Sequence, residues 1–171
     1  MMAQFKKATK NPCEYIKYYM SDDISVWYIL LTNFAGNDDE YTFEDEEKNK
    51  RFGQYLVKMT APAEFPFKPP SFTFLTPNGV YDLDGPICIS IGEFHAENYR
   101  AVLGMSGFAN QLISGIVGWE SLEHGIRIIR TTCVKKKELA MESEKFNELY
   151  YPQILKDVNE SYDNYSAKFA K

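Results

Sequence analysis

The chain changes character between residues 75 and 100. Before that point, its apolar residues form short, dense runs over residues 24–34, 54–60 and 71–75, which are rich in β-branched and aromatic side chains. After it, apolar residues recur at helical spacing. Strands followed by helices, without regular alternation of the two, favour an α+β domain. We therefore expect an antiparallel meander sheet of about four strands, backed by helices.

One helix is expected at the start of the chain and three after residue 104. A first helix over about residues 1–10 ends before Pro12, because proline disfavours the helical conformation in the residue that precedes it. A central helix over about 105–117 turns an apolar stripe toward the sheet. A third is predicted over 131–150, with its lysine-rich start in water, and a fourth begins at Pro152. The residues predicted to face inward on the third helix are Leu139, Phe146 and Leu149.

The segment 35–50 is strongly acidic. It holds seven aspartates and glutamates and only two lysines. It is too polar to pack and too long for a tight hairpin. We predict a solvated loop with no binding role.

Composition excludes several classes of function. A chain of 171 residues buries about two-thirds of its unfolded surface, so residues 1–171 are expected to form a single domain, with a helical extension from about 151. The net charge of −5 argues against nucleic acid partners, and no uninterrupted apolar run suits a membrane. Three cysteines without a C-x-x-C pair predict neither disulfides nor a zinc site. We expect no metal, no cofactor and a reducing, cytoplasmic setting.

Residues 65–95 show no regular period, and chemistry is expected there. Three prolines within 66–70 fix backbone φ and remove hydrogen-bond donors, which predicts a rigid, extended entry to a strand. That strand ends in an Asn78-Gly79 turn. Cys88 follows ten residues after the asparagine, behind a Gly-Pro pair. The sequence thus predicts a rigid loop that carries an amide and a thiol.

These motifs resemble the ubiquitin-conjugating enzymes, a family marked by PFKPP, then HPN, then a cysteine in an I-C-hydrophobic context. Here they read PFKPP (66–70), TPN (76–78) and ICI (87–89). The tail-anchored endoplasmic-reticulum branch, the J-type, is closer still, because it has threonine in TPN and a D-F-H that EFH (93–95) resembles. NPCEYI (11–16) also looks like this branch. The resemblance spans roughly residues 5–150 and implies the ubiquitin-conjugating-enzyme fold.

The resemblance implies that Cys88 accepts ubiquitin from the activating enzyme as a thioester and, with a ubiquitin ligase, transfers it to a substrate. A thiol suits this role, because a thioester reacts readily with amines. Asp82, Asp84 and Glu93 are near in sequence, and their negative charge is expected to raise the pKa of the thiol, so that it depends on partner enzymes. From residue type alone, Cys88 is also compatible with a small buried hydrophobe.

Other roles also follow from the resemblance. Asn78 would hold the loop and stabilise the oxyanion, although a plain turn residue is the alternative. His95 matches the D-F-H position, either as a loop brace or as a catalytic part. In the family, an acidic residue in the loop after the central helix usually orients or deprotonates the incoming lysine. In this chain the corresponding loop is 118–125. The candidates there are Glu120, Glu123 and His124, among which spacing does not choose; ordinary solvated polar residues are the alternative.

Ligase binding is assigned in the same way. The family's apolar patch corresponds to Phe67, and to Ala101 with Val102 in place of its Pro-Ala pair. Phe67 is equally compatible with the core. The lost proline and the sequence YRAVLG (99–104) indicate altered ligase choice. Ala96 and Tyr99 stand where the family has proline and tryptophan, which indicates a different geometry for the loop that carries His95.

Three functions remain open. The first is an active ubiquitin-conjugating enzyme. The second is a catalytically inactive variant that serves as a binding module, against which the presence of both Cys88 and Asn78 argues. The third is an unrelated cysteine hydrolase, which needs a histidine beside the thiol. Members of the J-type branch carry a C-terminal membrane tail, whereas this chain ends in hydrophilic DNYSAKFAK. It is therefore expected in the cytoplasm, at the cytosolic face of the endoplasmic reticulum if a tail has been removed.

Overall fold

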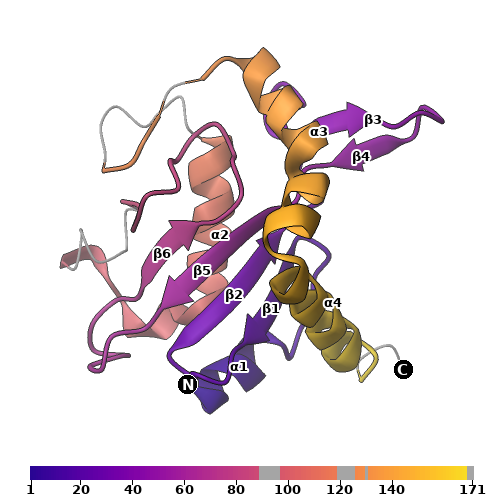
Figure 1. Ribbon diagram of the computed structural model, residues 1–171. Coiled ribbons are helices and arrows are strands. Elements are labelled where there is room, and N and C mark those ends of the chain that lie inside the picture. The colour runs from indigo at the N-terminus through magenta and orange to yellow at the C-terminus, as the bar shows by residue number, and fades with distance from the viewer. Residues whose placement is uncertain (89–96, 119–125, 130, 169–171) are drawn as a thin grey trace.

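The computed structural model describes residues 1–88, 97–118, 126–129 and 131–168 (Figure 1). None of the helices within these ranges is both long and apolar enough to cross a membrane. The elements, in chain order, are α1 (Met2–Ala8), β1 (Ile16–Met20), β2 (Val26–Leu31), β3 (Thr42–Glu44), β4 (Lys50–Phe52), β5 (Tyr55–Thr60), β6 (Ser71–Phe74), the 3-10 turn η2 (Ala101–Leu103), α2 (Gly104–Val117), α3 (Cys133–Tyr150) and α4 (Pro152–Ser166).

The main sheet has four antiparallel strands in the order β1-β2-β5-β6. This confirms the α+β class and the three predicted strands. β1 was not predicted, because helices cover both of its faces and its sequence, IKYYM, lacks a clear alternation of apolar and polar residues.

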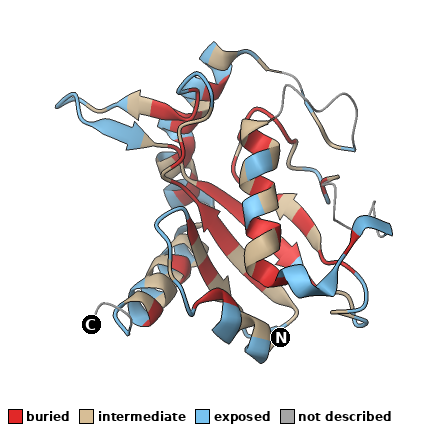
Figure 2. Cartoon of the chain, turned by 180° about the vertical axis from the view of Figure 1, so that it is seen from behind, coloured by how far each residue is buried: buried red, intermediate tan, exposed pale blue. Residues whose placement is uncertain are grey.

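The sheet lies between two helices (Figure 1). On one face, Ile29 and Leu31 belong to the large core that α2 completes with Phe108 and Leu112. This face and the inner side of α2 are red in Figure 2. On the other face, Leu30 packs with Val158 of α4. Because successive side chains of a strand point to opposite faces, the alternation along β2 places α2 and α4 on opposite sides.

Helix α4 also covers the outer edge of β1. The backbone N–H of Tyr18 donates to the Tyr165 hydroxyl at 3.2 Å, and Ser161 Oγ donates to the Tyr18 carbonyl at 2.7 Å. Lys17 Nζ donates to Asn159 Oδ1 at 2.7 Å. Side chains of α4 therefore satisfy backbone groups that an edge strand would otherwise expose to solvent or to another chain.

The prediction of a solvated loop over 35–50 was wrong in part. Strands β3 and β4 form a hairpin, and its acidic tip is held by Asp45, whose carboxylate accepts from the Glu47 and Asn49 amides. Tyr41, in the middle of the segment, is fully buried and donates its hydroxyl to the Ile116 carbonyl at 3.1 Å. Tyr41 and its buried neighbours Glu40 and Thr42 therefore anchor a segment whose composition is otherwise that of a loop.

Helix α3 lies where it was predicted, but its orientation was predicted wrongly. Leu149 is 68% exposed, and Leu139 and Phe146 are only half-buried. Lys136, expected in water, is fully buried. This helix packs against loop backbone, which requires hydrogen-bonding side chains more than apolar ones. The buried residues of α3 are Lys136, Ala140, Ser143 and Asn147.

Candidate active site

Asn78 is buried at the centre of the turn that follows β6. Its side-chain Oδ1 accepts from the Val80 and Tyr81 amides at 2.9 and 2.8 Å. Its Nδ2 donates to the carbonyls of Thr76 and Tyr81 at 3.3 and 3.2 Å. Both amide hydrogens are thus engaged inside the loop. In this conformation the side chain acts as a brace, and donation to an oxyanion would require one of these bonds to be exchanged.

Gly79 ties the same turn to α3. Its φ of +79° belongs to the left-handed region, and a Cβ there would lie 2.7 Å from Thr131 Oγ1 and 2.8 Å from Lys136 Cγ. Thr131 donates its hydroxyl to the Gly79 carbonyl at 2.7 Å. Only glycine therefore fits this position without displacing the start of α3.

Thr76, the first residue of the TPN motif, is also fully buried. Its hydroxyl accepts from the Leu56 amide at 2.9 Å and donates to Asn147 Oδ1 on α3. Asn147 Nδ2 in turn donates to the Gln54 carbonyl at 3.0 Å. The threonine therefore joins the loop to β5 and to α3. Asn147 was not predicted, because the helical pattern was read for apolar residues alone.

We expect Thr76→Val to lower the free energy of unfolding by about 1–3 kcal/mol. Valine keeps the shape but leaves the Leu56 amide and the Asn147 carbonyl oxygen without the hydroxyl that pairs them. Urea unfolding measures this loss. Thr60→Val, on the exposed end of β5, is the matched control and is expected to change stability by less than about 0.5 kcal/mol. Equal effects of the two substitutions would contradict the network.

Cys88 lies at the end of the loop, with its side chain partly accessible and not in a disulfide. The preceding residue, Ile87, is buried, and its amide donates to the Phe72 carbonyl of β6 at 2.8 Å. The Cys88 amide donates to the Ile126 carbonyl at 3.2 Å. The cysteine backbone is therefore held between β6 and residues 126–129.

Residues 126–129 run alongside the loop that precedes Cys88. The Ile129 amide donates to the Val80 carbonyl at 2.7 Å, and the Asp82 amide donates to the Arg127 carbonyl at 3.0 Å. The Arg127 guanidinium lies 3.4 Å from Asp82 and 3.8 Å from Asp84. Asp82 and Asp84, two of the acidic residues predicted near the thiol, therefore share a cation that is distant in sequence. The third, Glu93, lies outside the described residues.

Tyr81 is a further residue of the site that sequence reasoning missed. Its ring is buried and stacks on Phe74, with centroids 5.4 Å apart. Burial, and secondarily the negative charge of Cys88, raise the pKa of Tyr81 to about 12. The hydroxyl therefore remains protonated at neutral pH.

The three residues predicted to bind a ligase are all exposed. Phe67 is 88% exposed and is therefore not in the core, and Val102 is 80% exposed beside the exposed Ala101. Tyr99 links the two loops, because its hydroxyl donates to the Pro66 carbonyl at 2.7 Å. The candidates that lie outside the described residues are His95, Glu120, Glu123 and His124.

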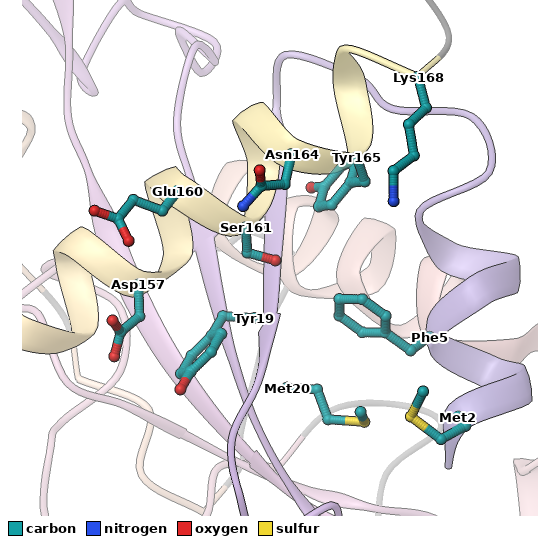
Figure 3. Close-up of a pocket in the computed structure, with 10 residues that line it drawn as sticks. All are labelled: Met2, Phe5, Tyr19, Met20, Asp157, Glu160, Ser161, Asn164, Tyr165 and Lys168. Carbon is teal, nitrogen blue, oxygen red and sulfur yellow. The ribbon is translucent and has the colours of Figure 1, made fainter.

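A hollow of about 390 Å³ lies elsewhere, between α1, β1 and α4 (Figure 3). Phe5, Met20 and Tyr165 contribute apolar surface to it, and Asp157 and Glu160 line it from α4. It sits at the β1 edge of the sheet, whereas Ile87 attaches the cysteine loop to β6 at the opposite edge. This hollow is therefore separate from the candidate active site.

Sequence comparison finds that the chain is similar to several ubiquitin-conjugating enzymes. No protein-family model matches it. It is 29% identical over 145 residues to ubiquitin-conjugating enzyme E2 6 of Debaryomyces hansenii, covering 84% of this chain and 54% of that protein. It is 32% identical over 117 residues to ubiquitin-conjugating enzyme E2 J2 of Homo sapiens, covering 63% of this chain and 43% of that protein. The chain thus spans about half the length of these curated relatives.

Among solved structures, human ubiquitin-conjugating enzyme E2 G1 aligns with a TM-score of 0.49 and 24% identity, covering 67% of this chain and 89% of that one.

Proposed function

We propose that this chain is the catalytic domain of a ubiquitin-conjugating enzyme, with Cys88 as the residue that carries ubiquitin. One observation carries the proposal. The partly accessible Cys88 follows a loop that the buried Asn78 braces. This arrangement occurs in a chain that is similar over most of its length to a ubiquitin-conjugating enzyme. We propose a single domain over residues 1–171, with α4 as a C-terminal extension.

The proposed reaction has two acyl transfers. In the first, Cys88 Sγ attacks the thioester carbonyl of ubiquitin on the activating enzyme, a new carbon–sulfur bond forms, and the departing cysteine thiolate takes up the proton. In the second transfer, a substrate amine attacks the Cys88 thioester while a ubiquitin ligase is bound. An amide forms, Cys88 leaves as thiolate, and the proton released by the amine returns to it.

The residues around Cys88 have distinct parts in this scheme. The bonds from β6 and residues 126–129 fix the backbone of the nucleophile, so little reorganisation precedes attack. Arg127 offsets the charge of Asp82 and Asp84 near an incoming anion or thiolate. Asn78 keeps the loop rigid. We propose that Phe67 and Val102 contribute to a ligase-binding surface, since both are exposed and Tyr99 ties their loops together.

A finer assignment is to the J-type branch, supported by the TPN motif and by similarity to ubiquitin-conjugating enzyme E2 J2. The structure gives a physical reason for a threonine at position 76. Its hydroxyl is buried and hydrogen-bonds both β5 and α3 where water cannot reach. We propose the cytoplasm as the site of action, at the cytosolic face of the endoplasmic reticulum if the longer protein carries a membrane tail.

A charging assay tests the proposal. The chain is incubated with ubiquitin, activating enzyme and ATP, and the products are separated with and without thiol reductant. An adduct that reductant removes is the expected result. Absence of an adduct would favour the inactive binding module. Hydrolysis of ester or peptide substrates without activating enzyme would favour the hydrolase.

We expect the charged chain to discharge onto hydroxyl acceptors as well as onto lysine. A hydroxyl must lose its proton as it attacks, and His124, or else His95, is a suitable base near neutral pH. Discharge onto free lysine, serine and threonine between about pH 6 and 8.5 measures this. Use of lysine alone, with no effect of His124→Ala or His95→Ala, would leave Glu120 or Glu123 as the gate.

A further inference from the structure

The outer face of α3 carries an uncovered apolar stripe. Val134, Met141 and Leu149 are 68%, 56% and 68% exposed. At 3.6 residues per turn they fall within about 80° of one another around the helix. The opposite face of α3 is buried against the TPN loop and the start of β5. Within the described part of the chain, α3 therefore leaves three large apolar side chains in solvent, while hydrogen-bonding side chains fill much of its buried face.

Charged residues alternate with apolar ones along this stripe. Glu138 lies between Val134 and Met141, and Lys145 lies between Met141 and Leu149. Both charged side chains are exposed. Glu138 pairs with Lys135 at 3.0 Å, but each of these side chains is 52% exposed, so the pair is weak and readily exchanged. The stripe thus reads apolar, acid, apolar, base, apolar.

This order is self-complementary for two antiparallel helices. With a two-fold axis between Met141 and Glu142, Glu138 and Lys145 lie equally far on either side, about 5 Å along the helix. Each therefore faces its opposite charge on the second copy. Val134 and Leu149 are likewise equidistant, at about 11 Å. We propose that this surface, the α3 stripe, is the interface of a two-fold homodimer.

The shape of α3 fits the same arrangement. A hollow of about 280 Å³ opens between Glu142, Lys145, Phe146, Leu149 and Tyr150. It is mainly apolar, and the rings of Phe146 and Tyr150 lie 4.5 Å apart beside it. The two-fold axis brings Val134 of the second copy to the level of this hollow. Each copy thus supplies one projecting side chain and one hollow, as an interface between identical surfaces requires.

The expected dimer is weak. A single helix face buries less surface than a stable interface needs, so a dissociation constant on the order of tens of micromolar is expected. The net charge of −5 on each copy also opposes association at long range. The two symmetry-related Glu138–Lys145 contacts must therefore set the register. This inference does not depend on the proposed enzymatic activity.

A charge-exchange series on the whole chain tests the dimer by sedimentation. Glu138→Lys places like charges opposite each other twice, as does Lys145→Glu, and each is expected to weaken dimerisation at least about tenfold. The double variant restores opposite charges and is expected to return within about threefold of the original affinity. Glu160→Lys on α4, exposed and similarly paired with Lys156, is the control and is expected to have little effect.

Each outcome bears directly on the proposal. A chain that stays monomeric at all concentrations would overturn it. So would a dimer that neither single substitution weakens, or a double variant no stronger than the singles. Because every substituted side chain is exposed, circular dichroism is expected to show unchanged folding in all variants.

Discussion

Cys88→Ala is expected to abolish the reductant-sensitive adduct with ubiquitin, and Cys88→Ser is expected to replace it with an adduct that reductant leaves intact. Alanine offers no nucleophile, whereas a serine hydroxyl forms an oxyester in place of a thioester. Intact mass measurement after charging distinguishes the two. The site is partly accessible, and both variants keep the backbone bonds of Ile87 and Cys88, so both are expected to fold.

The other two cysteines supply the controls. Cys13 is exposed and Cys133 begins α3, and neither lies on the loop that Asn78 braces. Cys13→Ser and Cys133→Ser are expected to charge as the unsubstituted chain does. A Cys88→Ala protein that still forms a reducible adduct would contradict the assignment of the nucleophile.

Asn78→Ala is expected to lower the free energy of unfolding by about 2–4 kcal/mol. The substitution removes four hydrogen bonds at once and leaves the amides of Val80 and Tyr81 and the carbonyls of Thr76 and Tyr81 without this partner. Because these groups are neighbours, their separate costs do not add fully. Denaturant unfolding measures the loss. Asn49→Ala, at the exposed tip of the β3–β4 hairpin, is the matched control, with a smaller expected effect.

The same variant separates two roles for Asn78. If it braces the loop, charging and discharge are expected to weaken together, in step with the loss of stability. If its amide also reaches the oxyanion, discharge to a free amine falls further than charging, measured where the variant remains folded. Normal stability together with normal discharge would reduce Asn78 to an ordinary turn residue.

Local patterns predicted the parts of the fold that depend on neighbouring residues. The stripe of α2 and the strands β2, β5 and β6 were found because one period dominates each segment. β1 was missed because both of its faces are covered. The buried side of α3 was misassigned because helical amphipathicity assumes an apolar partner, whereas Asn147 and Ser143 meet backbone groups.

The candidate site shows the same division. Asn78 and Cys88 were found because they stand close together in a distinctive motif. Arg127 and Asn147 join the same loop only through the fold, because Arg127 pairs with Asp82, 45 residues earlier, and Asn147 accepts from Thr76, 71 residues earlier. Nothing in their own segments marks them. A buried tyrosine such as Tyr81 is likewise indistinguishable from ordinary core until its neighbours are known.

Peptide-level mapping of the charged, unsubstituted chain tests the central claim most directly. The chain is charged with ubiquitin, activating enzyme and ATP, digested without reductant, and the modified peptide is identified by mass spectrometry. We expect one ubiquitin per chain, linked to the peptide that contains Cys88 and released by reductant. No adduct, or an adduct confined to Cys13 or Cys133, would contradict the account.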